Sequence, residues 1–66
     1  MQFTINGEQA YALSLVFAEQ AARVDRDETL GEVTFTKQGI GGEMVVAFPS
    51  DGRTFEISAG GTIEEI

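Results

Sequence analysis

Helical periodicity is confined to one long segment of this chain, and alternating periodicity governs most of the residues after it. From Gly7 to about Asp25, apolar residues recur at about 100° per residue, the spacing of an amphipathic helix. Asn6 is a favourable N-cap, and Gln9 three residues later completes a capping-box pattern. The sequence therefore predicts one helix near the start of the chain.

The predicted helix has more apolar surface than one buried face requires. The stripe expected to face the core contains Ala10, Leu13, Phe17, Ala21 and Val24. A second apolar group extends this arc to one side and contains Tyr11, Leu15, Ala18 and Ala22. This group either makes extra core contact with a long loop or the C-terminal tail, or it forms a self-association or partner surface around Tyr11 and Leu15.

Short segments in which polar and apolar residues alternate predict strands on both sides of the helix. These segments are residues 2–5, 29–37, 43–48 and 53–58, and residues 62–66 form either a short last strand or a frayed tail. Residues 43–48 are apolar on both faces, which indicates a central strand. Glycines in 38–42 and the Pro49–Gly52 segment predict turns, and Gly31 is a candidate bulge.

Helix and strands therefore segregate along the chain, which predicts an α+β fold within a single domain of residues 1–66. The expected architecture is one helix packed on an antiparallel sheet, in the order β-α-β-β-β, with a further short strand if residues 62–66 pair. The expected core is Phe3, Ile5, Leu13, Phe17, Val24, Val33, Phe35, Met44, Val46, Phe48, Phe55 and Ile57.

The composition argues against catalysis and against a bound cofactor. A chain of 66 residues has a small core and little room for a substrate cleft. It contains no Cys and no His, so it lacks the commonest catalytic base, thiolate nucleophiles and the commonest transition-metal ligands. We therefore expect no enzymatic activity, no catalytic residues, no cofactor and no metal.

Two motifs resemble ligand-binding loops only superficially. The Gly39–Gly42 cluster is followed by neither Lys-Ser/Thr nor a helix, so it fails the requirements of a phosphate-binding loop. Residues 25–27 resemble the start of an EF-hand, but Leu30 and Thr36 occupy the positions that require Gly and Glu. Both segments are better interpreted as ordinary loops.

The net charge of −7, from 11 acidic and 4 basic residues, is the main functional indication. Such a surface repels nucleic acid and anionic membranes and favours a basic protein partner. Eleven acids are too few to copy a duplex of about 28 Å, which carries about 16 charges, but a local imitation of phosphates is feasible. The alternative is a solvated face that only maintains solubility.

The acidic residues are densest between the predicted helix and sheet. The candidate partner-binding patch is Asp25, Asp27, Glu28 and Glu32. A secondary set of acids is Glu43, Asp51, Glu56, Glu64 and Glu65. Arginines at 23, 26 and 53 are positioned to interrupt these clusters.

With its acids at 25–32 and its compact meander from Thr29 to Ser58, the whole chain resembles the small acidic anti-CRISPR inhibitors of phages and mobile elements, especially those acting on type I systems. The resemblance rests on size, charge and α+β layout, because those inhibitors share no common motif. It implies a protein that mimics DNA locally, binds a basic DNA-contacting surface on a Cas subunit, and blocks DNA recognition or recruitment.

The leading hypothesis is thus a stoichiometric inhibitor whose acidic surface occupies a basic nucleic-acid-binding groove. The alternative is a small non-catalytic structural or oligomerising module that uses the apolar flank of its helix. Either would be a monomer or a weak homodimer. The absence of Cys and of a membrane-spanning or leader segment leads us to expect a cytoplasmic protein, in a bacterial host cell if the resemblance holds.

Overall fold

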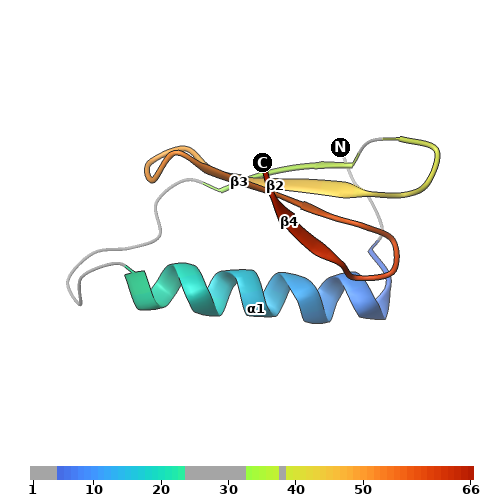
Figure 1. The fold of residues 1–66 in the computed structure, drawn as a ribbon, viewed down its shortest axis with the longest axis horizontal. Helices are drawn as coiled ribbons and strands as arrows, with labels where there is room; N and C mark the ends of the chain where they lie inside the picture. Colours follow the sequence, from blue (N-terminus) through green and yellow to red (C-terminus); the bar gives the residue numbers. More distant parts are fainter. Residues whose placement is uncertain (1–4, 24–32, 38) are drawn as a thin grey trace.

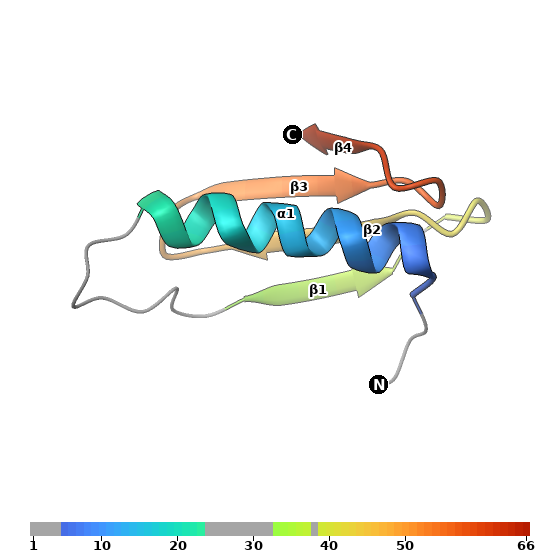
Figure 2. The ribbon, with the colours of Figure 1, turned by 90° about the horizontal axis from the view of Figure 1, so that it is seen from below.

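A computed structural model describes residues 5–23, 33–37 and 39–66. One helix, α1 (Gly7–Arg23), precedes four strands: β1 (Thr34–Lys37), β2 (Met44–Phe48), β3 (Arg53–Ile57) and β4 (Ile63–Glu65). The strands form an antiparallel sheet in the order β1-β2-β3-β4. The helix lies along one face of this sheet (Figures 1 and 2). The predicted α+β class is confirmed, as is the central position of β2.

The predicted element order was wrong, because the fold runs α-β-β-β-β rather than β-α-β-β-β. Of the expected strand 2–5, only Ile5 lies within the described residues, and it does not belong to a strand. Ile5 instead packs against the core immediately before the helix cap. A buried contact at this position therefore explains its apolar character without a strand.

The C-terminal segment forms a strand rather than a frayed tail. Ile63, Glu64 and Glu65 pair with Ile57, Glu56 and Phe55, respectively. The reversal before β4 uses Gly61 at φ 88°, a conformation that favours glycine, and the Ser58 amide donates to the Thr62 carbonyl at 2.9 Å. This turn returns the chain alongside β3 and completes the sheet.

The predicted capping box is confirmed. The Asn6 side-chain oxygen accepts a hydrogen bond from the Gln9 amide at 2.7 Å, and the Gln9 side-chain oxygen accepts one from the Asn6 amide at 3.3 Å. The same two side chains also reach the sheet side, since Asn6 Nδ2 donates to the Ala59 carbonyl and Gln9 Nε2 to the Gly42 carbonyl, both at 2.8 Å. The cap therefore starts the helix at Gly7 and attaches it to two loops of the sheet.

The buried face of α1 differs from the predicted stripe. The buried residues are Gln9, Ala12, Val16 and Gln20, whereas the predicted Ala10 and Ala21 are exposed. Two of these four are polar, and their hydrogen bonds to other elements make their burial acceptable. The prediction from periodicity assumed that polar residues face solvent. The predicted contact face therefore lies at a different angle around the helix from the observed one.

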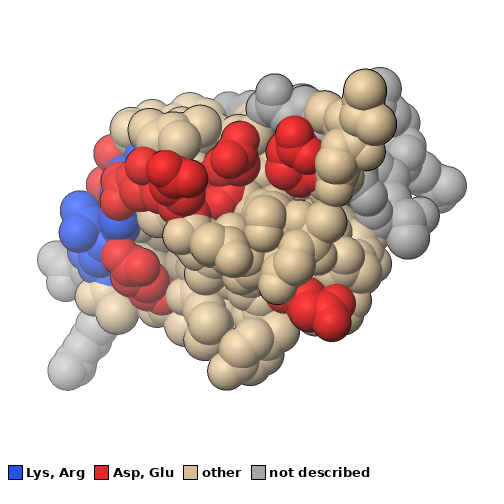
Figure 3. Space-filling view, turned by 45° about the vertical axis from the view of Figure 1, so that its right-hand side comes forward, with Lys and Arg blue, Asp and Glu red and all other residues tan. Residues whose placement is uncertain are grey.

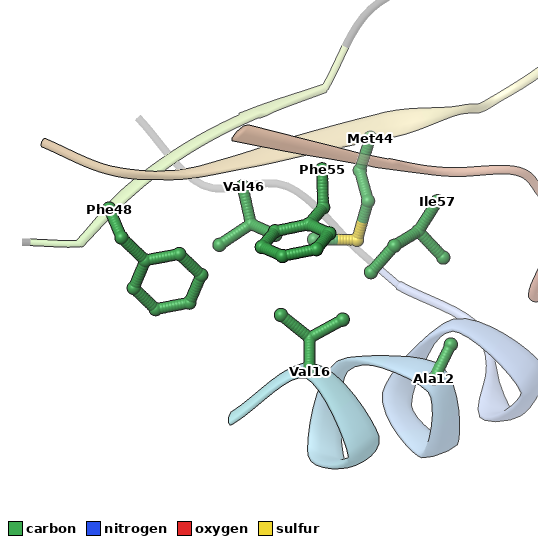
Figure 4. Packing of buried hydrophobic residues seen from close by; sticks show 7 residues of the cluster. All are labelled: Ala12, Val16, Met44, Val46, Phe48, Phe55 and Ile57. Carbon is green, nitrogen blue, oxygen red and sulfur yellow. The ribbon is translucent and has the colours of Figure 1, made fainter. Parts of the chain in front are cut away.

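The core lies between α1 and the inner face of β2 and β3 (Figure 4). Its buried hydrophobic residues are Ala12, Val16, Met44, Val46, Phe48, Phe55 and Ile57. Ile5, Leu13, Phe17 and Val33 pack against this cluster and are partly buried. Phe35 was predicted in the core but is 37% exposed, because β1 is an edge strand that the helix covers only partly. Phe3 and Val24 lie outside the described residues.

Both predicted turns lie at the ends of β2. After β2, the Asp51 and Gly52 amides donate to the Phe48 carbonyl at 2.9 and 2.8 Å, and Gly52 has φ 72°. Before β2, Gly39 and Gly42 have φ 82° and 81°. The expected bulge at Gly31 and the expected helix end near Asp25 lie outside the described residues.

Candidate protein-binding surface

The acids of the main candidate patch, Asp25, Asp27, Glu28 and Glu32, lie outside the described residues. The structure places the five secondary acids, however, together with Glu8 and Glu19 on α1. Their positions show which carboxylates are already bound within the molecule and which remain turned to solvent.

Glu56 and Glu64 lie directly opposite each other on neighbouring strands. Phe55 and Ile57 face the helix, so the alternating strand geometry places Glu56 and its partner on the opposite face of the sheet, which α1 does not cover. Glu56 is half-buried and Glu64 is exposed. Like charges that face each other across strands destabilise a sheet by up to about 1 kcal/mol. Within the described part of the chain, neither carboxylate has an ion-pair partner.

The rest of the face opposite α1 carries small or neutral side chains and the exposed Ile66, whose amide donates to the Thr54 carbonyl. By the strand register, it presents Thr34, Thr36, Val45, Ala47 and Thr54 beside the two glutamates. We call this set of residues, with Glu56 and Glu64, the outer face. Its charge is therefore negative, and the two glutamates carry it.

Glu65 lies on the helix-facing side of β4 and is bound by Arg53. Arg53 donates from Nε to one Glu65 oxygen at 2.9 Å and from Nη2 to the other at 2.7 Å. These hydrogen bonds lower the pKa of Glu65 and raise that of Arg53. The charge of Glu65 is thus compensated within the molecule.

Arg53 also connects the sheet to the helix. Its Nη1 donates to the Gln20 side-chain oxygen at 2.6 Å, and its Nη2 donates to Glu19 at 3.1 Å. The guanidinium lies 4.7 Å from the centre of the Phe55 ring, which adds a cation–π contact. The Arg53 side chain is only 14% exposed. It therefore acts as a structural tie that compensates acids on two elements.

Asp51, in the turn between β2 and β3, is compensated in the same region. Gln20 Nε2 donates to its carboxylate at 3.1 Å, and Arg23 approaches the same oxygen to 3.5 Å. The Gln20 hydrogen bond is the main reason that the pKa of Asp51 is lowered, with Arg23 contributing as well. Asp51 is therefore also compensated within the molecule.

Glu43 lies apart from the other acids, over the glycine-rich turn before β2. Its carboxylate occupies the space that side chains at Gly39 and Gly41 would need. The turn therefore requires glycine both for its backbone angles and for room beside Glu43. This is a local packing role.

The secondary acids therefore do not form one contiguous patch. Figure 3 shows acidic side chains in a row beside the basic side chains and at separate places on the same view. Asp51 and Glu65 are compensated by the arginines, Glu43 packs on a turn, and Glu56 and Glu64 adjoin on the outer face. Among the secondary acids, Glu56 and Glu64 are thus the best placed to contact another molecule.

The suggested self-association residues are both turned to solvent on α1. Tyr11 is 68% exposed and Leu15 is 47% exposed, and Ala18 and Ala22 of the same predicted group are exposed as well. Extra core contact by this group is excluded for the described residues, because the helix packs on the sheet with its other side. The second apolar group is therefore a surface feature.

Sequence reasoning missed the structural role of Arg53 and of the two buried glutamines. A signal for Arg53 was present, since it alternates with Phe55 and Ile57 and therefore shares their inward face. Gln20 gave no comparable signal, because only its partners Arg53 and Asp51, more than 30 residues away, satisfy its amide.

The described residues contain no group of three or more His, Cys, Asp or Glu that could hold a metal ion. Among the same residues, α1 is too short and too polar to span a membrane. Comparison with protein-family models, curated proteins and solved structures gives no match for this chain.

Proposed function

We propose that this protein is a stoichiometric inhibitor whose acidic surface binds a basic nucleic-acid-binding groove on a partner protein. The observation that carries the proposal is the Glu56–Glu64 pair, two adjacent carboxylates without a described cation on the sheet face opposite α1. Arg23 and Arg53, the arginines that the structure describes, are both engaged at the helix side of the molecule. The outer face thus keeps its negative charge.

Binding of a basic partner would offset the repulsion between Glu56 and Glu64 with attractive contacts. A guanidinium or ammonium placed beside Glu56 and Glu64 relieves their mutual repulsion and forms charge-assisted hydrogen bonds. Most side chains around the two carboxylates on this face are threonines or small residues, so a groove wall can approach them. The overall net charge of −7 steers the encounter and raises the association rate.

The partner that fits this chemistry is a protein with a groove rich in Arg and Lys. The size, charge and α+β layout of the chain resemble anti-CRISPR inhibitors, and the proposed partner is therefore a DNA-contacting Cas subunit of a type I complex. The acids at 25, 27, 28 and 32 would extend the contact. Occupation of the groove would block DNA recognition or recruitment without any catalytic step.

The test compares two variants with the same net charge. In Glu56→Gln/Glu64→Gln the outer face loses both charges, whereas Ala10→Lys/Ala21→Lys adds two positive charges at exposed positions of α1. Both changes raise the net charge by two. We expect the first variant to lose affinity for a purified type I complex at least tenfold, and the second to lose much less.

The measurement is competition with target DNA, repeated at low and high salt. Binding by the wild type should weaken as salt rises, because exposed charges are screened. Equal affinity for the wild type and the Gln variant would contradict a role for the outer face. If reversal of Asp27, Glu28 and Glu32 to Lys also left inhibition intact, the charge-based mechanism as a whole would fail.

The alternative function, a non-catalytic oligomerising module, is favoured by a different observation. Tyr11 and Leu15 expose apolar side chains on the side of α1 that the sheet leaves uncovered. This surface is separate from the outer face, and the two functions are compatible in one chain.

A further inference from the structure

The solvent side of α1 carries a regular seam of apolar side chains. The seam residues are Tyr11, Leu15, Ala18 and Ala22, and all four are exposed. Their spacing of four, three and four residues is that of the a and d positions of a coiled coil, which keeps them on one line along the helix. The buried residues Ala12 and Val16 face the sheet from the other side. The seam is therefore free to meet another helix.

We propose that this seam binds the same seam of a second copy of the chain, with the two helices antiparallel and Leu15 at the two-fold axis. An isologous contact of this kind closes on itself and yields a dimer rather than a fibre. The proposal does not depend on the acidic outer face, which belongs to the sheet on the opposite side of the molecule.

The sizes of the seam residues favour the antiparallel arrangement. The large side chains, Tyr11 and Leu15, occupy the N-terminal half of the seam, and the alanines occupy the C-terminal half. Antiparallel helices place Tyr11 of one copy over Ala18 of the other, so a large side chain meets a small one. Parallel helices would place tyrosine on tyrosine and leave a gap between alanines.

The position of Glu8 favours the same arrangement. Glu8 precedes Leu15 by seven residues and therefore lies on the same line of the helix as the seam. With Leu15 at the axis of antiparallel helices, Glu8 of each copy lies at the level of Ala22 of the other. Parallel helices would instead bring glutamate opposite glutamate.

Within the described residues, the helix surface carries little uncompensated negative charge. Its charged residues are Glu8, Glu19 and Arg23, and Glu19 is bound by Arg53. Ile63, 37% exposed, is an apolar residue of β4 on the helix-facing side of the sheet, paired with Ile57. Among the described residues, the proposed dimer therefore pairs sides that carry less uncompensated negative charge than the outer face.

The available area predicts a weak dimer. A helix of 17 residues is about 26 Å long, and a contact strip about 10 Å wide covers roughly 260 Å² per copy. Stable interfaces cover about 800 Å² per partner. Two chains that each carry a net charge of −7 also repel each other at low salt. The dimer should therefore form at high protein concentration and strengthen as salt rises.

Sedimentation of the full chain over a concentration series, from about 10 μM to about 1 mM, tests the proposal in the affinity range expected for a contact of this size. The wild type should pass from monomer to dimer, and Leu15→Glu should weaken the association at least tenfold. Ile40→Glu is the matched control, because Ile40 is fully exposed in the turn between β1 and β2. A wild type that stays monomeric throughout, or an equal effect of both variants, would overturn the proposal.

Circular dichroism verifies that Leu15→Glu and Ile40→Glu keep the helix. A failure of the dimer proposal is distinguishable from a failure of the inhibitor proposal, because Glu56→Gln/Glu64→Gln leaves the seam unchanged.

Cysteine trapping gives a second readout on a chain that has no cysteine of its own. A mixture of Tyr11→Cys and Ala18→Cys chains should form the mixed disulfide in preference to either homodimer. Leu15→Cys should cross-link with itself, whereas Ile40→Cys should not do so above the random rate. Equal cross-linking of all pairs would overturn the proposed register.

Discussion

Arg53 binds both carboxylate oxygens of Glu65, through Nε at 2.9 Å and Nη2 at 2.7 Å. The same guanidinium reaches Glu19 and Gln20 on α1, so one side chain joins the edge strand β4 to the helix. A planar guanidinium suits this position because its donors are fixed in a fork that matches a carboxylate. Because α1 and β4 are far apart in sequence, Arg53 connects two parts of the chain that local interactions do not hold together.

Replacement of Arg53 should therefore destabilise the fold beyond the loss of one surface ion pair. We expect Arg53→Ala to lower the thermal midpoint more than Arg23→Ala, which removes a single ion pair with Asp51 at 3.5 Å. Arg53→Lys should recover only part of the loss, since an ammonium cannot reproduce the paired hydrogen bonds. Thermal melts followed by circular dichroism measure all three variants. An equal loss for the two alanine variants would contradict the structural role of Arg53.

The free energy of unfolding should fall on the acid side. The pKa of Glu65 is lowered from its ordinary value of 4.5, mainly by the Arg53 hydrogen bonds, and that of Asp51 from 3.8, mainly by Gln20. A lowered pKa in the folded state contributes stability above the unfolded pKa, and this is lost as pH falls through the folded value. Urea unfolding from pH 7 to pH 2.5 should show a smaller acid-side loss for Glu65→Gln than for the wild type. Identical profiles would disprove the linkage.

Phe48 should be the most sensitive core position. It is fully buried and makes edge-to-face contacts with Phe17 and Phe55, with ring centres 5.7 and 6.0 Å apart. Phe48→Ala should lower the free energy of unfolding by about 3–5 kcal/mol. Phe35→Ala is the control, with an expected loss of about 1–2 kcal/mol because its side chain is 37% exposed. Urea denaturation measures both, and a larger loss at Phe35 would place the core elsewhere.

Asn6 has two separable functions at the start of α1. Asn6→Ala removes the cap on the Gln9 amide and the hydrogen bond to the Ala59 carbonyl, and should cost about 1–2 kcal/mol. Asn6→Asp keeps the cap and removes only the donor to Ala59, so its loss should be smaller. Chemical denaturation ranks the two variants against the wild type. If both lose the same amount, the contact with Ala59 rather than the cap carries the stabilisation.

The outer face should show a trade-off between stability and binding. Glu64→Lys converts the like-charged pair with Glu56 into an opposite-charged pair, which should raise the free energy of unfolding by about 0.5 kcal/mol or more. The same change should weaken binding to a basic partner. Denaturation and competition with DNA test the two effects on one protein. If the variant were more stable and still inhibited as well as the wild type, the Glu56–Glu64 pair would not be needed for inhibition.

Local physical chemistry made much of this fold predictable. The capping box at Asn6 and Gln9, the helix after it, and the turn at Pro49–Gly52 depend on neighbouring residues alone, and all three are confirmed. The alternation of Met44, Val46 and Phe48 likewise identified the buried face of β2. Such features are encoded within a few residues, so periodicity and capping patterns detect them.

Only the tertiary structure decided which side of α1 is buried and where charge remains. Gln9 and Gln20 face the core because Gly42, Asp51 and Arg53, which are distant in sequence, satisfy their amides. Among the secondary acids, no sequence pattern distinguished Glu65 from Glu64. Strand register directs Glu65 to Arg53 on the helix side and Glu64 to the outer face beside Glu56. A carboxylate's partners are set by strand pairing and helix packing, and no local pattern contains that information.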